Sequence, residues 1–164
     1  MRADDRSVTI GWHEGPRVAL RELFELAEDS PQQLDGYIDD GRVLVARDGA
    51  GDVVGHLQLV PAARPGGHEI KNVAVRPDRQ GRGIGRRLVA HSLDVCRQEG
   101  AMTVEVATAV ADIDNVRFYQ RCGFRARSIG RDTFTVANGY PPDLVADGIP
   151  VLDSIRFDVS FEAP

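Results

Sequence analysis

The hydrophobic and polar positions in the first third of the chain alternate between strand and helix periods. Residues 8–12 alternate as a strand does, and residues 16–27 place their apolar side chains at helical spacing. A Ser-Pro pair, typical of a capped helix start, opens a second short helix over residues 30–38. Two apolar runs, residues 43–47 and 53–60, flank a turn rich in Gly and Asp, and they predict an antiparallel pair of strands.

The rest of the chain continues this mixture. A strand over residues 68–75 leads through a glycine-rich turn into a long amphipathic helix. A β-branched strand over residues 102–108 follows, and then a short helix that Asp112 or Asp114 would cap. Residues 124–161 predict two or three further strands around a long loop. The order of elements favours an α/β (α+β) fold in which helices flank one largely antiparallel sheet.

Composition limits the size and the partners of this fold. With 164 residues, 42% of them hydrophobic, the chain is expected to form a single domain over residues 1–164 around one core. A formal net charge of −5 argues against a nucleic-acid partner. No apolar run reaches the roughly 18 residues of a membrane span, and the polar start at residues 1–5 predicts no signal peptide. We therefore expect a cytoplasmic protein with no membrane partner.

Cysteine and histidine usage leaves little room for a metal or a disulfide framework. Cys96 and Cys122 do not form a Cys-x-x-Cys pair. The four histidines lack the spacing of metal ligands on one helix face. The sequence thus predicts no metal site.

The glycine-rich turn carries the strongest chemical signal. Gly81, Gly83 and Gly85 lie between a strand and a helix, where glycine permits positive φ and close approach of a ligand. Residues 76–87 hold five arginines and one aspartate, a local charge of +4 in an acidic chain. A helix start in such surroundings favours a polyanionic ligand. The spacing fits neither a Walker A loop nor a dinucleotide fingerprint, and an arginine-rich turn that only caps the helix is the alternative.

Three ordered motifs resemble one family. Residues 80–85 (QGRGIG) match the Gln/Arg-x-x-Gly-x-Gly/Ala signature of the GNAT superfamily of acyl-CoA-dependent N-acetyltransferases. Residues 72–77 (NVAVRP) look like the fourth strand of that family, and residues 118–124 (FYQRCGF) resemble its tyrosine-bearing helix and following strand. The resemblance covers residues 69–125, about a third of the chain, and the order of elements fits the remainder.

The resemblance implies acetyl-CoA as the acetyl donor. The backbone of residues 81–86 would hold its pyrophosphate, and the pantetheine arm would bind the fourth strand where strands four and five splay apart. Asn115 is a further candidate, although many relatives carry their asparagine where this chain has Asp112. The candidate cofactor-binding residues are Val73, Ala74, Val75, Gln80, Gly81, Arg82, Gly83, Ile84, Gly85, Arg86 and Asn115.

The same resemblance suggests the reacting groups. Tyr119 matches the family tyrosine that protonates the leaving thiolate, and the backbone N–H of Val75 would polarise the thioester carbonyl. Acyl transfer also needs a base, because an amine of pKa about 10.4 is mostly protonated at neutral pH. Glu69 is the first candidate and His68, on the opposite strand face, is the alternative; a bulge in this strand would change which of them points inward.

The segments expected to bind the acceptor are the least patterned part of the sequence. Tyr37, Phe134 and Tyr140 are candidate walls of its cleft. Acidic residues that suit a cationic amine, or that are simply solvated, are Glu28, Asp29, Asp35, Asp39, Asp40, Asp143, Asp147 and Asp153. We expect a small-molecule amine as acceptor and allow for a homodimer. A protein N-terminal or lysine acetyltransferase and a non-catalytic acyl-CoA sensor remain the alternatives.

Overall fold

A computed structural model describes residues 7–161 of the chain. The strands are β1 (Thr9–Trp12), β2 (Arg42–Arg47), β3 (Val53–Pro61), β4 (Gly67–Val75), β5 (Thr103–Ala109), β6 (Arg125–Gly130), β7 (Val145–Ala146), β8 (Ile149–Pro150) and β9 (Ser154–Ser160). The helices are α1 (Arg21–Glu25), α2 (Pro31–Tyr37), α3 (Ile84–Gln98) and α4 (Ile113–Arg121), with 3₁₀ turns η2 (Arg17–Leu20), η3 (Pro77–Arg79) and η4 (Val136–Asn138). The polar segment over residues 1–5 lies outside the described residues. Within the described part, no helix is long and apolar enough to cross a bilayer.

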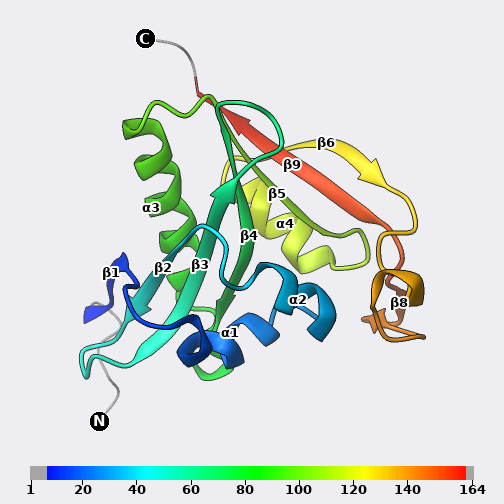
Figure 1. The fold of residues 1–164 in the computed structure, drawn as a ribbon, viewed down its shortest axis with the longest axis horizontal. Coiled ribbons are helices and arrows are strands. Elements are labelled where there is room, and N and C mark those ends of the chain that lie inside the picture. The colour runs from blue at the N-terminus through cyan, green and yellow to red at the C-terminus, as the bar shows by residue number, and fades with distance from the viewer. Residues whose placement is uncertain (1–6, 162–164) are drawn as a thin grey trace.

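Seven of the described strands form one sheet in the order β1-β2-β3-β4-β5-β9-β6 (Figure 1). Neighbouring strands are antiparallel except β4 and β5, which run parallel. The C-terminal strand β9 inserts between β5 and β6. The mixed, mostly antiparallel sheet predicted from the sequence is confirmed.

The parallel pair β4–β5 comes apart partway along its length. Its register runs from Gly67 opposite Thr103 to Ile70 opposite Val106 and then stops. β4 continues to Val75 and β5 to Ala109 without further pairing between them. Beyond Ile70 the two strands diverge, as Figure 1 shows. The expected splay between the fourth and fifth strands is therefore confirmed.

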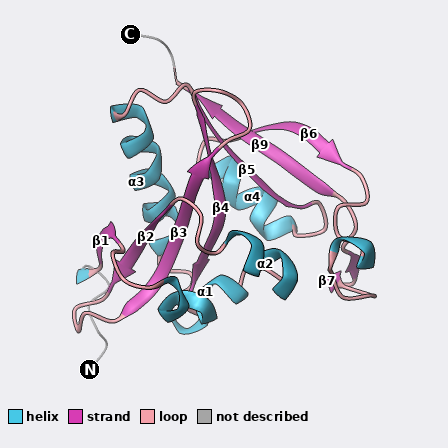
Figure 2. Ribbon diagram, in the orientation of Figure 1, coloured by secondary structure: helices cyan, strands magenta, loops and turns pink. Residues whose placement is uncertain are grey.

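Helices cover both faces of the sheet (Figure 2). α3 and α4 pack on one face, where Leu88 and Tyr119 join a core that includes Phe157 of β9. α1 and α2 pack on the other face, where Phe24 and Leu34 form a second, smaller core. Alternate residues of β2 contribute to the two cores, because successive side chains of a strand point to opposite faces.

Most of the predicted elements agree with the structure, but two differ. The single helix expected over residues 16–27 is instead η2 followed by α1, because Leu20 takes a non-helical φ of −104° and ψ of 0° between them. Leu20 and Phe24 both reach the core, while Val18 is 74% exposed. The C-terminal region contains a two-residue strand pair, β7 and β8, within its long loop, in addition to β6 and β9.

Candidate active site

The glycine turn before α3 has an open backbone. Gly81 has a φ of 74° and Gly83, the residue that precedes α3, a φ of 81°. No described heavy atom outside their immediate chain neighbours would lie within 4 Å of a Cβ on either residue. These two glycines meet the expectation of positive φ and open space.

Gly85 does not serve the purpose that the sequence suggested. It lies in the first turn of α3, and a Cβ there would contact the Phe118 ring at 3.5 Å and the Val75 side chain at 3.7 Å. These are ordinary van der Waals distances, so Gly85 is required neither for close packing nor for a left-handed turn. The expectation that all three glycines permit positive φ is wrong for this one.

Side chains around the turn hold it against the sheet. Gln80 donates its side-chain N–H to the carbonyl of Val75, 2.9 Å away, and so ties the turn to the end of β4. Arg79 makes an ion pair of 2.8 Å with the nearly buried carboxylate of Asp48. That carboxylate also accepts backbone N–H bonds that close the β2–β3 turn. The glycine turn is thus braced from two sides.

These contacts reduce the number of arginines available to a ligand. Arg76 makes two hydrogen bonds to Asp78, of 3.1 and 2.9 Å, and Arg87 donates to the carbonyl of Val8 at 2.8 Å. Arg86 is exposed and acts electrostatically on the thiol of Cys122. Arg86 is therefore the candidate phosphate ligand that these contacts favour most.

β4 contains the bulge that the sequence analysis considered. Gln58 of β3 pairs with Asn72 and the next residue of β3 pairs with Ile70, so Lys71 is an extra residue on β4. Glu69 and Lys71 line a pocket of about 630 Å³ together with residues of α2. Ile70 lies in the core beneath α3, and Val73 packs against that core. We call the α1–α2 face of β4 the acceptor face.

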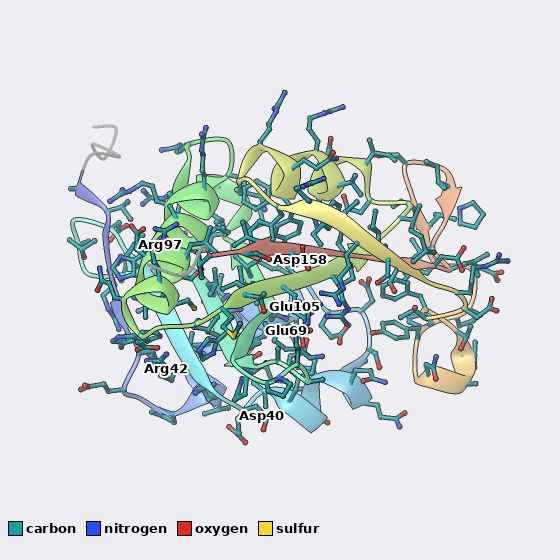
Figure 3. The ribbon with its side chains drawn as sticks, turned by 90° about the horizontal axis from the view of Figure 1, so that it is seen from above. Asp40, Arg42, Glu69, Arg97, Glu105 and Asp158 are labelled. Atoms are coloured by element: carbon teal, nitrogen blue, oxygen red, sulfur yellow. The ribbon has the colours of Figure 1, made fainter. Side chains whose placement is uncertain are left out.

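Glu69, the first candidate base, lies on the acceptor face at the closed end of the splay. It is opposite Glu105 of β5, which in turn is opposite Asp158 of β9, and Figure 3 shows the three carboxylates in succession. Arg156 lies 3.8 Å from Glu69 and 3.6 Å from Glu105, and the ammonium of Lys71 is 4.0 Å from Glu69. Glu69 is thus a carboxylate near the strand opening that is held between two cations.

His68, the alternative base, acts electrostatically on Glu99, which follows α3. It therefore lies toward the face that α3 covers and away from the pocket that Glu69 lines. This arrangement favours Glu69 over His68 as the candidate base.

Tyr119, on α4, points into the core and contacts Phe157 of β9. It is 5% exposed, and its ring contacts Phe118, Phe124 and Phe157 at centroid distances of 5.1, 6.0 and 6.2 Å. Burial raises the pKa of its phenol well above the ordinary value, so that the hydroxyl keeps its proton. The hydroxyl forms no hydrogen bond with any residue that the structure describes. Its proton is available to a group outside the chain.

Asn115, a further cofactor candidate, lies in the first turn of α4. Its side-chain amide donates to the carboxylate of Asp112 at 2.8 Å and approaches the hydroxyl of Thr108 at 3.5 Å. Asp112 caps the same helix by accepting the backbone N–H of Asn115. The structure therefore gives Asn115 a capping role, and its contact with a cofactor stays a prediction.

The aromatic residues named as walls of the acceptor cleft come together on the acceptor face. The rings of Phe134 and Tyr140 meet edge to face at 5.0 Å, and Tyr140 donates a hydrogen bond of 3.3 Å to Glu28. Tyr37 lies close by in α2 and lines the 630 Å³ pocket. The acidic candidates do not form one cluster, since Asp35, for example, makes an ion pair of 2.8 Å with Arg21.

Sequence reasoning missed three buried polar residues behind this cleft. His56, Gln58 and Asn72 are each at most 4% exposed, and all three point from β3 and β4 toward α1 and α2. Gln58 donates to backbone carbonyls at the end of α2, including that of Tyr37 at 2.7 Å. The available signal was the presence of a histidine and a glutamine inside an otherwise apolar strand.

Comparison with known proteins places this site in a family. Residues 12–124 match the acetyltransferase (GNAT) family. The N-acetyltransferase YvbK of Bacillus subtilis is 33% identical over 84% of this chain and 86% of its own length. A Bacillus subtilis acetyltransferase solved with CoA superposes with a TM-score of 0.85, at 30% identity over 94% of this chain and 99% of that one. A GNAT acetyltransferase from Elizabethkingia anophelis with acetyl-CoA bound gives a TM-score of 0.85, at 26% identity over 96% and 100% of the two chains.

These likenesses define the class of protein as an N-acetyltransferase. The chain belongs to the acetyltransferase (GNAT) family. The resemblance seen in its glycine turn and tyrosine helix is therefore confirmed, and the chain is an acyltransferase.

Proposed function

We propose that this enzyme transfers the acetyl group of acetyl-CoA directly to a primary amine of a small, cationic molecule. The observation that carries the proposal is the parting of β4 from β5 beside the glycine turn. Between Lys71 and Val75, β4 makes no bond to β5, so its edge is free to bind an extended ligand. The turn at Gly81 and Gly83 follows directly and offers open space at the start of α3.

The described residues fit acetyl-CoA. The positive end of α3, a helix of 15 residues, suits a pyrophosphate, and Arg86 adds an exposed cation one turn along. The free edge of β4 at Val73 and Val75 suits the amides of pantetheine. The donor supplies an acetyl thioester, and its sulfur is a good leaving group once it is protonated.

The chain's own groups then have distinct roles. Glu69, which lies near the cationic groups of Lys71 and Arg156, takes a proton from the acceptor amine, directly or through water. A backbone N–H on the free edge of β4 polarises the carbonyl. Tyr119, which burial keeps protonated and which has no hydrogen-bond partner among the described residues, donates its proton to the sulfur.

Two curated relatives point to different acceptors. A streptothricin acetyltransferase of Streptomyces lavendulae is 29% identical over 58% of this chain. The [ribosomal protein bS18]-alanine N-acetyltransferase of Salmonella typhimurium is 30% identical over 49% of this chain. We favour a small acceptor because the loop between β6 and β9 docks on α2, through a hydrogen bond of 2.9 Å from the Gln33 side chain to the carbonyl of Asn138.

A thiol-release assay tests the proposal. The protein is incubated with acetyl-CoA and, one at a time, with alkylamines, diamines, an aminoglycoside, peptides with a free N-terminus and a lysine peptide. We expect turnover with small cationic amines and a rise in Tm with acetyl-CoA alone. Preferred turnover of peptides would make it a protein acetyltransferase. A Tm shift without turnover of any acceptor would make it a sensor.

A further inference from the structure

Glu28, between α1 and α2, has a carboxylate that lies near two tyrosine hydroxyl groups. Tyr140 donates a hydrogen bond to it at 3.3 Å, and the Tyr37 hydroxyl and the backbone N–H of Ser30 are nearby donors that act to lower its pKa. Burial raises the pKa of Glu28, while these donors and the nearby charge of Lys71 oppose the rise. Of the eight acidic candidates named from the sequence, this one is therefore built into a hydrogen-bonded site.

The sheet holds Tyr37 in place for this contact. Asn72 donates its side-chain N–H to the Tyr37 hydroxyl at 3.0 Å and to the carbonyl of Phe24 at 3.1 Å. Its side-chain oxygen accepts from Nε2 of His56 at 2.8 Å. Because the Tyr37 hydroxyl accepts from Asn72, its own proton is left for another acceptor, and Glu28 is the carboxylate on which this hydroxyl acts. The hydrogen bonds thus run from the buried His56 through Asn72 to the Tyr37 hydroxyl beside Glu28.

This cluster already accommodates an ammonium group of the chain itself. Nζ of Lys71, the sole lysine in the sequence, lies 5.0 Å from the ring centroid of Tyr37, a cation–π distance. The same ammonium acts electrostatically on Glu28 and lies 4.0 Å from Glu69.

We propose that Glu28 recognises an ammonium group of the acceptor that is distinct from the amine to be acetylated. Tyr37 and Tyr140 orient the Glu28 carboxylate, and Asn72 and His56 are positioning residues that act through Tyr37. The preferred acceptor is therefore a diamine or a larger polycation. This inference rests on the proposed function, because it assigns the part of the acceptor cleft that lies away from Glu69.

The test compares a linear α,ω-diaminoalkane with the n-alkylamine of the same carbon number, by thiol release. The wild-type enzyme should prefer the diamine. Glu28→Gln keeps the size and the acceptor oxygen but removes the charge, and should lower kcat/KM for the diamine by about 10- to 100-fold. The loss should lie mainly in KM, and kcat/KM for the alkylamine should fall by a much smaller factor. Glu22→Gln, which removes an exposed carboxylate of α1, is the matched control and should behave as wild type.

The positioning role of Asn72 is tested in the same assay. Asn72→Leu should reduce the preference for the diamine, and its effect should be less than additive with Glu28→Gln because both act on one chain of hydrogen bonds. The Tm shift with CoA, measured for every variant, confirms that the fold and the cofactor site persist.

The outcomes distinguish the inference about Glu28 from the proposed function. A wild-type enzyme that acetylates both amines equally, or a diamine preference that survives Glu28→Gln, would overturn this inference and leave the proposed function standing. Failure of the wild type to release thiol with any amine or peptide would overturn the proposed function, and this inference with it.

Discussion

Tyr119→Phe separates chemistry from stability, because the substitution removes a single oxygen from a well-packed ring. The contacts of the ring with Phe118, Phe124 and Phe157 remain in the variant. The hydroxyl makes no hydrogen bond to a described residue, so its removal leaves no buried partner unsatisfied. We therefore expect the free energy of unfolding to change by less than about 1 kcal/mol.

The expected loss of activity is much larger. A positioned general acid contributes about 10²–10⁴-fold to a rate, which corresponds to about 3–5 kcal/mol of activation free energy. The fall should appear in kcat, while the affinity for acetyl-CoA should hardly change, because the proton is donated only as the thiolate leaves. Tyr140→Phe, on the acceptor side, provides a contrast and should raise KM for the acceptor instead.

Thiol release and thermal unfolding are measured on one preparation of each variant. Unchanged turnover in Tyr119→Phe would remove Tyr119 from the mechanism. A large fall in Tm together with activity would show that the hydroxyl serves the fold, contrary to its lack of partners among the described residues.

Further predictions concern the glycine turn and the buried histidine. Gly83→Ala should lower the free energy of unfolding by about 1–2 kcal/mol, because alanine is strained at a φ of 81°. Gly85 lies inside α3, where an added Cβ makes ordinary contacts, so Gly85→Ala should not lower the free energy of unfolding. Equal losses of unfolding free energy for the two variants, measured by urea unfolding, would contradict this assignment. Burial lowers the pKa of His56 to about 4, below the value near 6.5 in the unfolded chain. The unfolded state then binds more protons, so stability should fall by up to about 3 kcal/mol as pH drops from 6.5 to 4, and His56→Gln should flatten that slope in urea unfolding.

The cofactor side of the site was open to prediction because its signals are local. The glycines before α3 lie within five residues of one another, and the Ser30 and Asp112 caps each act on a backbone N–H three residues ahead. Such features depend on residues that are neighbours in sequence, so they can be recognised without knowledge of the fold. The insertion of β9 between β5 and β6 was not predicted, since it depends on a pairing between distant segments.

The acceptor side of the site could be predicted only in part, because its contacts depend on tertiary structure. Tyr37 and Tyr140 were named, but Glu28 was one of eight acidic candidates with equal claims. What distinguishes it is partial burial, a hydrogen bond from Tyr140 in the loop after β6, and the nearby hydroxyl of Tyr37 in α2. The partners of a carboxylate are set by tertiary structure, and the pattern along the chain does not report them.

The bulge at Lys71 connects the two sides of the site. In a regular strand, Glu69 and Asn72 are three positions apart and would point to opposite faces. The extra residue shifts the alternation by one, so that Asn72 bonds to Tyr37 on the acceptor face while Val73 turns back to the core beneath α3. The candidate base and the residue that positions Tyr37 therefore share one face, directly before the backbone of β4 becomes free to bind the acetyl donor. One inserted residue thus brings the base, the acceptor contacts and the donor edge together on a single strand.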